Sequence, residues 1–332
     1  MSDESLLTDA AARLFADLAE KRNAPFAELW TPVEEAAFPL LLVPEADGGF
    51  GGSWTDAFAV LRLTGYHAVP LPVGEAILAA WLLNRSGLEQ AEGLATIAPH
   101  AEGKIASGRF TGTLGHVPWG REASVIVAML DGRLIRLNRR DAAAEPHQNP
   151  ADEPRDTLRF AGAAVTQALC DADLTILGAL IRTAQIAGAM DAALAQSIAY
   201  ANEREQFGKP IGKFQALQQN LAVFAEEAAA VNCAGQAAFA AAGKYDGAAE
   251  FEVAAAKLRA NMAIGIGTST AHQVHGAIGF TKEYSLHPLT RRLWSWRSEF
   301  GNDSHWSRIL GAKVAATGAD GFWTTLTERS DP

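Results

Sequence analysis

The segment Tyr200-Ala-Asn-Glu-Arg204-Glu-Gln206-Phe207-Gly208-Lys-Pro210-Ile-Gly212-Lys-Phe214-Gln215 joins two apolar helical patterns through a tight turn. The first pattern runs to Tyr200 and is predicted to stop near Gly208, and a second helix is predicted to start near Phe214. Arg204 offers a rigid planar fork of donors, which suits a diphosphate. Gln206 and Gln215 can add neutral hydrogen bonds beside it. The alternative interpretation is a helix–helix corner with an exposed arginine.

This segment resembles the R-x-Q-F-G-x-P-I-x-x-F-Q signature of acyl-CoA dehydrogenases, flavoproteins that oxidise acyl-CoA thioesters between Cα and Cβ. Two further segments resemble family motifs and occur in the family's order. Val43-Pro-Glu-Ala-Asp-Gly-Gly-Phe-Gly51-Gly resembles the turn V-P-E-x-x-G-G-x-G. Gln273-Val-His-Gly-Ala-Ile-Gly-Phe-Thr-Lys-Glu-Tyr284 resembles Q-x-x-G-G-x-G-F-x-x-E-Y. The resemblance therefore extends from Val43 to Tyr284.

The composition is that of a soluble globular protein, because 48% of the residues are apolar and 20% are charged. An excess of 38 acidic over 28 basic residues gives a net charge of −10, which argues against nucleic-acid or membrane-surface partners. No apolar run is long enough to span a bilayer, and the acidic N-terminus lacks a secretory signal's basic and apolar regions. Two cysteines, Cys170 and Cys233, predict no disulfide framework and favour a cytoplasmic location. The histidines show no metal-binding pattern, so no metal site is predicted.

Three regions of different character follow one another along the chain. Residues 1–95 read as helices separated by turns. Residues 96–170 contain turn signals and β-prone runs such as Ser124–Leu130, with a charged, proline-containing loop expected at 139–155. Residues 171–332 are alanine-rich with few breakers, which favours a helical bundle. The expected fold is α+β, with an N-terminal helical domain, a small middle β domain and a C-terminal helical bundle, as the family resemblance also implies.

The resemblance implies flavin adenine dinucleotide (FAD) as the cofactor, bound between subunits. Arg204 of one subunit would then bind the pyrophosphate of its neighbour's cofactor, and Phe207 would pack near the adenosine half. Gln206 and Gln215 would bind in the same region. The resemblance also brings a second segment close to the dinucleotide, through Gln273, His275, Gly276 and Ala277. Ala277 stands where the family has a second glycine; the alternative interpretation is that Gly276 only marks a helix end.

The dehydrogenation implied by the resemblance needs a carboxylate that takes the α-proton while hydride leaves Cβ. The usual family position falls on Phe300, and Glu299 is one residue early, an offset of about 100° on a helix. A second family position falls in 174–182, which contains no carboxylate. The candidate bases are therefore Glu299 and, after it, Asp303, each on an altered backbone path.

The middle region also departs from the family, because it lacks the T-E-P-x-x-G-S-D motif that cradles the flavin ring. Thr111–Gly120 resembles the strand pair that follows that motif, and Trp119 is expected to pack inside the β domain. Arg291 and Arg292 are expected on a solvated helix face, or one of them at a subunit interface. The contacts donated to a neighbour's cofactor are thus kept, whereas those to the chain's own flavin ring and base are lost.

This pattern resembles short acyl-CoA dehydrogenases that act as unlike pairs on bulky acyl-CoAs such as sterol side chains. Three functions follow. The chain is a dehydrogenase subunit of a homo- or hetero-oligomer, a dimer or tetramer, which oxidises an acyl-CoA and passes electrons to an acceptor that the sequence does not identify. Alternatively, it is a noncatalytic FAD-binding partner subunit, or a flavin-free helical scaffold. The scaffold is disfavoured because Arg204, Phe207 and Gln215 have no shared packing reason to occur together.

Overall fold

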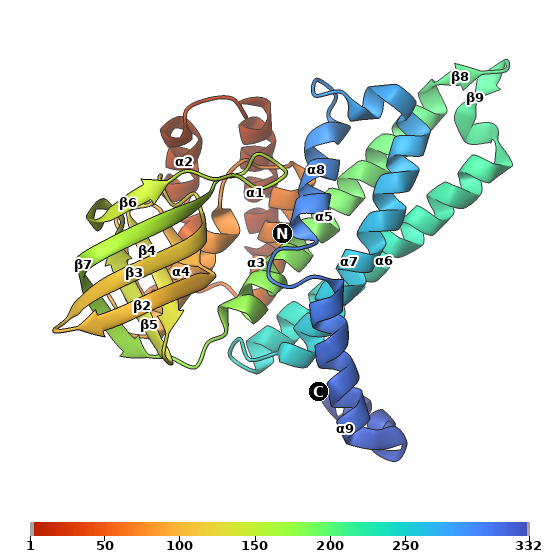
Figure 1. Cartoon of the computed structure of the whole chain (residues 1–332). Coiled ribbons are helices and arrows are strands. Elements are labelled where there is room, and N and C mark those ends of the chain that lie inside the picture. The colour runs from red at the N-terminus through yellow and green to blue at the C-terminus, as the bar shows by residue number, and fades with distance from the viewer. Residues whose placement is uncertain (1–2, 331–332) are drawn as a thin grey trace.

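The computed structural model describes residues 3–330; Met1 and Ser2, where the acidic N-terminal segment begins, and residues 331–332 lie outside it. Four helices precede a β domain, and further helices follow it (Figure 1). The predicted fold class is confirmed. The helices of the N-terminal part are α1 (Asp3–Glu20), α2 (Phe26–Glu35), α3 (Trp54–Tyr66) and α4 (Val73–Arg85). Those of the C-terminal part are α5 (Leu174–Glu203), α6 (Gln215–Lys244), α7 (Glu250–His275), α8 (Leu286–Trp296) and α9 (Asp303–Ser330).

The β domain is one curled sheet with the strand order β1-β4-β5-β7-β3-β2, and β6 pairs with β7. Its inward faces are apolar; Leu114, Val127 and Leu158, for example, are completely buried. The strand β1 pairs with β4 in parallel, and the other pairs in this sheet are antiparallel. The strands are β1 (Ala95–Ala98), β2 (His100–Ala106), β3 (Arg109–Pro118), β4 (Val125–Leu130), β5 (Arg133–Asn138), β6 (Ala142–Glu145) and β7 (Arg155–Leu169).

The prediction of a loop at 139–155 is wrong in part. Residues 142–145 form β6, which pairs with Thr157–Phe160 of β7 and extends the sheet. The backbone N–H and C=O groups of this segment are satisfied by pairing with β7, and charge and proline content gave no sign of this. The remainder, from 146 to 154, is irregular and runs toward the C-terminal helices.

The helix α5 lies at the centre of the molecule and packs against α3, α6, α7 and α8. It is apolar around most of its circumference, which is typical of a buried helix. Glycines allow α3 and α5 to cross at close range: a Cβ on Gly188 would collide with the carbonyl oxygen of Arg62, and one on Gly65 would collide with that of Gln185. The close crossing of α3 and α5 therefore requires glycine, which has no side chain, at positions 65 and 188.

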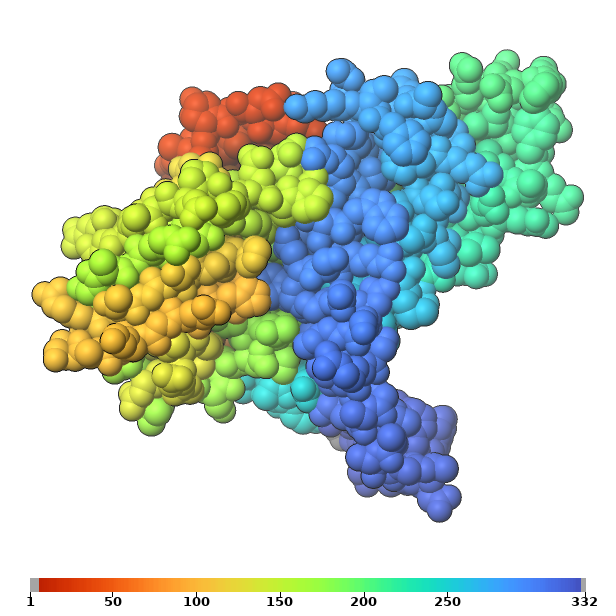
Figure 2. Space-filling model, in the orientation of Figure 1, coloured from red at the N-terminus to blue at the C-terminus, as the bar shows by residue number. Residues whose placement is uncertain are grey.

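The predicted helix–turn–helix around Gly208 is confirmed. The helix α5 ends at Glu203, a two-residue hairpin of β8 (Glu205–Gln206) and β9 (Lys209–Pro210) follows, and α6 begins at Gln215. Figure 1 shows this hairpin at the far end of the α5–α6 pair, on the side of the molecule opposite the β domain. The helix α9 extends from the body in a third direction, as the space-filling view also shows (Figure 2).

Within residues 3–330, no helix combines the length and the apolar character that a membrane crossing needs.

We expect Gly188→Ala to lower the free energy of unfolding by about 1–3 kcal/mol, because the added methyl group overpacks the α3–α5 crossing. Urea denaturation monitored by circular dichroism measures the change. Gly265→Ala in α7 is the matched control: a Cβ there meets no atom within 4 Å. It should leave stability unchanged or raise it by up to about 1 kcal/mol through helix propensity. Equal losses in both variants would contradict this account of the crossing.

Candidate functional site

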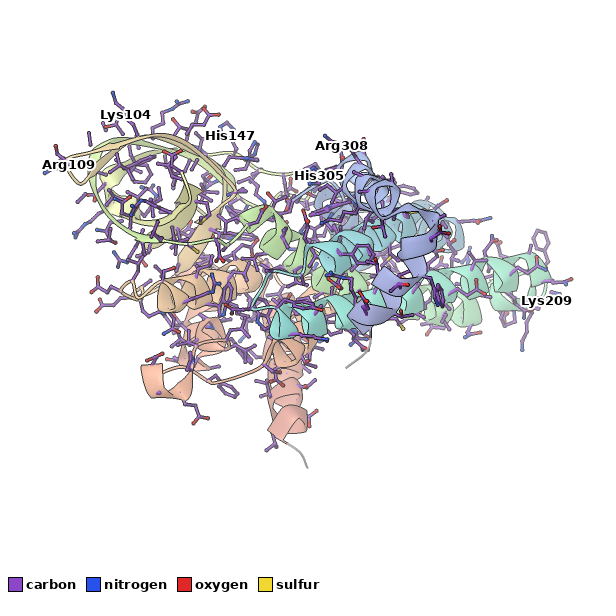
Figure 3. The ribbon with its side chains drawn as sticks, turned by 90° about the horizontal axis from the view of Figure 1, so that it is seen from below. Lys104, Arg109, His147, Lys209, His305 and Arg308 are labelled. Atoms are coloured by element: carbon purple, nitrogen blue, oxygen red, sulfur yellow. The ribbon has the colours of Figure 1, made fainter. Side chains whose placement is uncertain are left out.

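A cleft of about 870 Å³ opens between the β domain and the C-terminal helices. His100, His116 and His147 line it from the β domain. The opposite wall is formed by His305 of α9 and by the α8–α9 loop (residues 297–302). Figure 3 labels His147 and His305, which lie on either side of the boundary between the two parts. Burial and the neighbouring His116 lower the pKa of His100.

The position at which the family usually carries its catalytic base is occupied by an aromatic residue, Phe300. Phe300 has a left-handed backbone, with φ of 52°, and its ring packs on Gly178 of α5 so closely that a Cβ on Gly178 would overlap it. The two family positions considered for the base, on the α8–α9 loop and at the start of α5, therefore meet at one point in space. Neither provides a carboxylate there.

Glu299 lies at the inner wall of the cleft, where it belongs to a largely buried network of charges. Its carboxylate accepts from Arg182 Nε at 2.8 Å, from Arg155 Nε at 3.1 Å and from Asn149 Nδ2 at 2.8 Å. Arg182 also donates to Glu75 at 2.5 Å. The network thereby joins α4, α5, the first residue of β7 and the α8–α9 loop.

Glu153 extends the same network to α8. Its carboxylate accepts from Arg155 Nη2, from Arg292 Nε and from Trp296 Nε1, each at 3.0 Å. Arg292 was expected on a solvated helix face, and this prediction is wrong: its side chain is buried and pairs with Glu153. The alternative, that Arg291 or Arg292 lies at a subunit interface, stays a prediction. Arg291 lies nearer the surface and pairs with Asp152.

This environment determines the basicity of Glu299. Burial alone would raise the pKa of its carboxyl group, but the charges of Arg155 and Arg182 outweigh burial and hold the pKa at about 2. A carboxylate with so low a pKa is a weak proton acceptor. Asp303, the other candidate, pairs with Arg297 at 2.5 Å, and this hydrogen bond lowers its pKa as well.

Lys257 of α7 fixes the backbone of the α8–α9 loop from beneath. Its buried ammonium group donates to the carbonyl oxygens of Trp296 at 3.0 Å, Arg297 at 3.2 Å and Gly301 at 3.3 Å. Trp306 Nε1 donates to the Phe300 carbonyl oxygen at 3.1 Å. Burial lowers the pKa of Lys257 to about 7. Lys257 and Trp306 thus fix the loop backbone through its carbonyl oxygens. This keeps the Phe300 ring packed against Gly178 and the Glu299 carboxylate paired with Arg155 and Arg182.

The signature residues lie at the opposite end of the molecule. Arg204, Gln206 and Phe207 are exposed on the β8–β9 hairpin, and Gln215 is exposed at the start of α6. Phe207 is 92% exposed with a φ of 52°. Figure 3 labels Lys209 of this hairpin far from His147 and His305. These side chains therefore cannot reach the cleft of their own chain.

The second predicted segment lies at the same end of the helical bundle. Gln273 is exposed and accepts from Asn220 of α6 at 3.0 Å, and Gly276 and Ala277 are exposed in a short 3-10 helix, η5 (Gly276–Phe280). His275 is instead buried: its ring packs against Tyr200 at a tilt of 33°, and its Nδ1 is hydrogen-bonded to the Ala271 carbonyl oxygen. The structure thus brings the exposed parts of both predicted segments to one end.

The residues at this end fit a dinucleotide. The guanidinium group of Arg204 is exposed and forms no side-chain hydrogen bond or ion pair with residues 3–330, so its donors are available to a diphosphate. The chain's own β domain fits a flavin ring less well. Pro99 is the one residue between β1 and β2, so no loop projects there to cradle a ring.

Sequence reasoning missed Glu75, Glu153 and Arg155. Glu75 lies in a predominantly apolar helical segment, and Glu153 and Arg155 lie in a segment that was expected to be a surface loop. None of the three was therefore recognised as a candidate site residue. A signal was available in Arg182, a charge inside the long apolar pattern of α5, because such a charge requires a partner. Trp119 was predicted correctly: it is buried in the β domain and lies under the Arg155 guanidinium.

A family model described as "Acyl-CoA dehydrogenase, C-terminal domain" matches residues 177–314. Acyl-CoA dehydrogenase IpdE2 of Mycobacterium tuberculosis is 30% identical over 261 residues, which are 78% of this chain and 77% of that protein. Acyl-CoA dehydrogenase FadE34 of the same organism is 30% identical over 87% of this chain, and the match spans 43% of FadE34.

Solved structures share the fold across nearly the whole length. The steroid ACAD Tcur3481-Tcur3483, as a G363A variant, superposes with a TM-score of 0.84 at 22% identity, covering 95% of this chain and 98% of that one. The ChsE4-ChsE5 complex from Mycobacterium tuberculosis superposes with a TM-score of 0.83 at 22% identity, covering 96% and 99%.

We expect Glu299→Gln to lower the free energy of unfolding at pH 7 by about 3–5 kcal/mol, because it leaves Arg155 and Arg182 without their shared charge. The folded-state pKa lies below the ordinary value of 4.5, so the stabilisation is complete above that pH and is lost toward pH 2. The difference between wild type and variant, measured by urea denaturation, should therefore shrink as the pH falls through this window. Glu20→Gln on exposed α1 is the control. A difference that is independent of pH would contradict the ion-pair assignment.

Proposed function

Because the chain belongs to the acyl-CoA dehydrogenase family, we propose that it is the cofactor-completing subunit of a heteromeric acyl-CoA dehydrogenase. In such a complex its β8–β9 hairpin extends over FAD held by an unlike partner subunit. The partner supplies the catalytic base and oxidises the acyl-CoA between Cα and Cβ. The chain itself contributes binding groups to that site.

The observation that carries the proposal is the packing of Phe300 on Gly178. A general base must lie within hydrogen-bond reach of the proton it removes. Among the residues that line the cleft, the one carboxylate is Glu299, and two arginines hold its charge. The chain's own cleft is therefore without a free carboxylate, which supports a catalytic base on another subunit.

The exposed hairpin supports the second half of the proposal. Arg204 can bind a diphosphate through parallel N–H donors, with Gln206 and Gln215 as neutral donors beside it. Phe207, at 92% exposure, offers an aromatic face whose burial on a neighbour is favourable. FAD bound there would supply the hydride acceptor. The side chains named here would hold its diphosphate and adenosine portions and exclude water from them.

The relatives support an unlike partner and a bulky substrate. One structural neighbour is a complex of two different chains, ChsE4 and ChsE5, and another is described as a steroid ACAD. We extend both properties to this chain: the partner would be a different member of the family, and the substrate a CoA thioester with a steroid-sized acyl group.

A second candidate is a self-sufficient dehydrogenase with Glu299 as the base. The observation that favours it is position, since Glu299 lies on a loop that lines the cleft. This candidate requires Glu299 to leave Arg155 and Arg182 during catalysis.

The first test is the visible absorbance spectrum of the chain purified alone and of the complex obtained by co-expression with a family member that carries the base. We expect the chain alone to be colourless and the complex to show flavin bands that bleach with a steroid acyl-CoA. Arg204→Ala should lower FAD retention by the complex at least tenfold, because a hydrogen-bonded charge pair contributes about 1.5–3 kcal/mol. Arg13→Ala, an exposed arginine on α1, should leave it unchanged. Equal retention by both variants would refute the diphosphate contact.

The second test separates the two candidates through Glu299→Gln in the chain alone, with circular dichroism to establish that the variant is folded. One outcome is that the chain alone binds FAD that bleaches when a steroid acyl-CoA is added, while the FAD of the variant does not bleach. In that case Glu299 is the base, and the partner-subunit proposal fails. We expect instead no bleaching by either protein, together with bleaching by complexes that contain either one.

A further inference from the structure

A second recess lies on the β domain and shares no lining residue with the cleft. It has a volume of about 690 Å³, within the range of small-molecule sites. It is formed where the connection from α4 to β1 meets the start of β4 and the end of β5. Its lining residues are Glu89, Gln90, Glu92, Arg121, Ala123, Ser124, Val125, Arg136, Asn138, Arg139 and Arg140.

Four arginines line this recess, in a protein whose net charge is −10. Two of them have carboxylate partners: Arg121 pairs with buried Asp156 at 2.7 Å, and Arg136 lies 3.4 Å from the exposed Glu89. Arg139 and Arg140 form no ion pair with any residue that the structure describes. Two guanidinium groups of the recess therefore have no carboxylate within ion-pair distance among the described residues, although Glu92 also lines the recess.

Arg139 carries the clearest sign of a missing partner. Its Nη1 donates to the Ala142 carbonyl oxygen at 2.9 Å, but its Nε is buried without an acceptor. A buried N–H without a partner costs stability, and an acceptor supplied from outside the chain would remove that cost. The backbone N–H of Arg139 donates to the Ser124 carbonyl oxygen at 2.9 Å, which fixes the base of this side chain.

The neighbouring donors are also held in place. Arg136 Nε donates to the Glu89 carbonyl oxygen at 2.9 Å, and its Nη1 lies 3.4 Å from Asn138 Oδ1. Donors that are ordered before binding lose little entropy when a ligand arrives. A guanidinium fork matches the oxygen geometry of phosphate, which accepts several N–H bonds at once.

We propose that this recess binds a phosphate-bearing small molecule, with Arg139 and Arg140 as its principal cationic contacts. The acidic side chains Glu89 and Glu92, which are exposed at its rim, disfavour the extended polyanionic surface of a nucleic acid. The site is independent of the proposed cofactor contact at Arg204, which lies on the β8–β9 hairpin across the molecule.

The test is isothermal titration calorimetry of the full chain with inorganic pyrophosphate and with ADP at low ionic strength. We expect saturable binding to wild type. Arg140→Ala, which removes an exposed side chain, should weaken it at least about threefold, and Arg139→Gln with Arg140→Ala at least about tenfold. Arg133→Ala, an exposed arginine at the other end of β5, is the matched control and should bind like wild type.

The outcomes separate the proposal from its alternatives. Tighter binding of ADP than of pyrophosphate assigns the ligand to the nucleotides, and equal binding assigns it to simple phosphates. No saturable binding of either probe by folded wild type overturns the proposal. Binding that Arg204→Ala abolishes and Arg140→Ala leaves intact also overturns it, because the hairpin would then be the site.

Discussion

The buried charge network around Arg182 and Glu299 is the interaction on which the rest of the structure depends. Three carboxylates, those of Glu75, Glu153 and Glu299, alternate with three guanidinium groups, those of Arg155, Arg182 and Arg292. Each charge is buried or nearly so, and each would be costly alone. Because the partners come from α4, α5, β7, α8 and the α8–α9 loop, the network can be satisfied only when the three parts of the chain are docked together.

This network also determines the chemistry of the cleft. It takes Glu299 into the interior and leaves Phe300 as the side chain that faces Gly178. Lys257 holds the same loop through three carbonyl oxygens, so the arrangement is fixed by backbone as well as side-chain contacts. The α8–α9 loop, which lies where the family carries a catalytic base, therefore connects the domains in this chain through ion pairs and hydrogen bonds. The groups suited to a dinucleotide lie at the other end of α5, where they face outward.

Much of this could be predicted from the sequence. The helix–turn–helix around Gly208 followed from local turn chemistry and apolar periodicity, which depend on residues close together in the chain. An exposed Arg204, the alternative interpretation of this corner, followed from the same signals, since a short turn between two long helices has no room to bury the side chain. The strand β6 was missed because its partner is fifteen or so residues away and its alanines show no strand preference. Glu75 and Glu153 were missed because each becomes significant only through a distant arginine.

The sequence by itself therefore determined the family, the order α–β–α and the candidate residues for contact with a neighbour's cofactor. These depend on short motifs and on periodicity, whose physical basis is local. Tertiary structure decided the state of Glu299. The count along the chain placed it one residue from the expected base, but only the folded arrangement shows Arg155 and Arg182 beside it and a pKa of about 2. Electrostatic interactions act through space, so the chemistry of an ionisable group depends on neighbours that sequence spacing does not reveal.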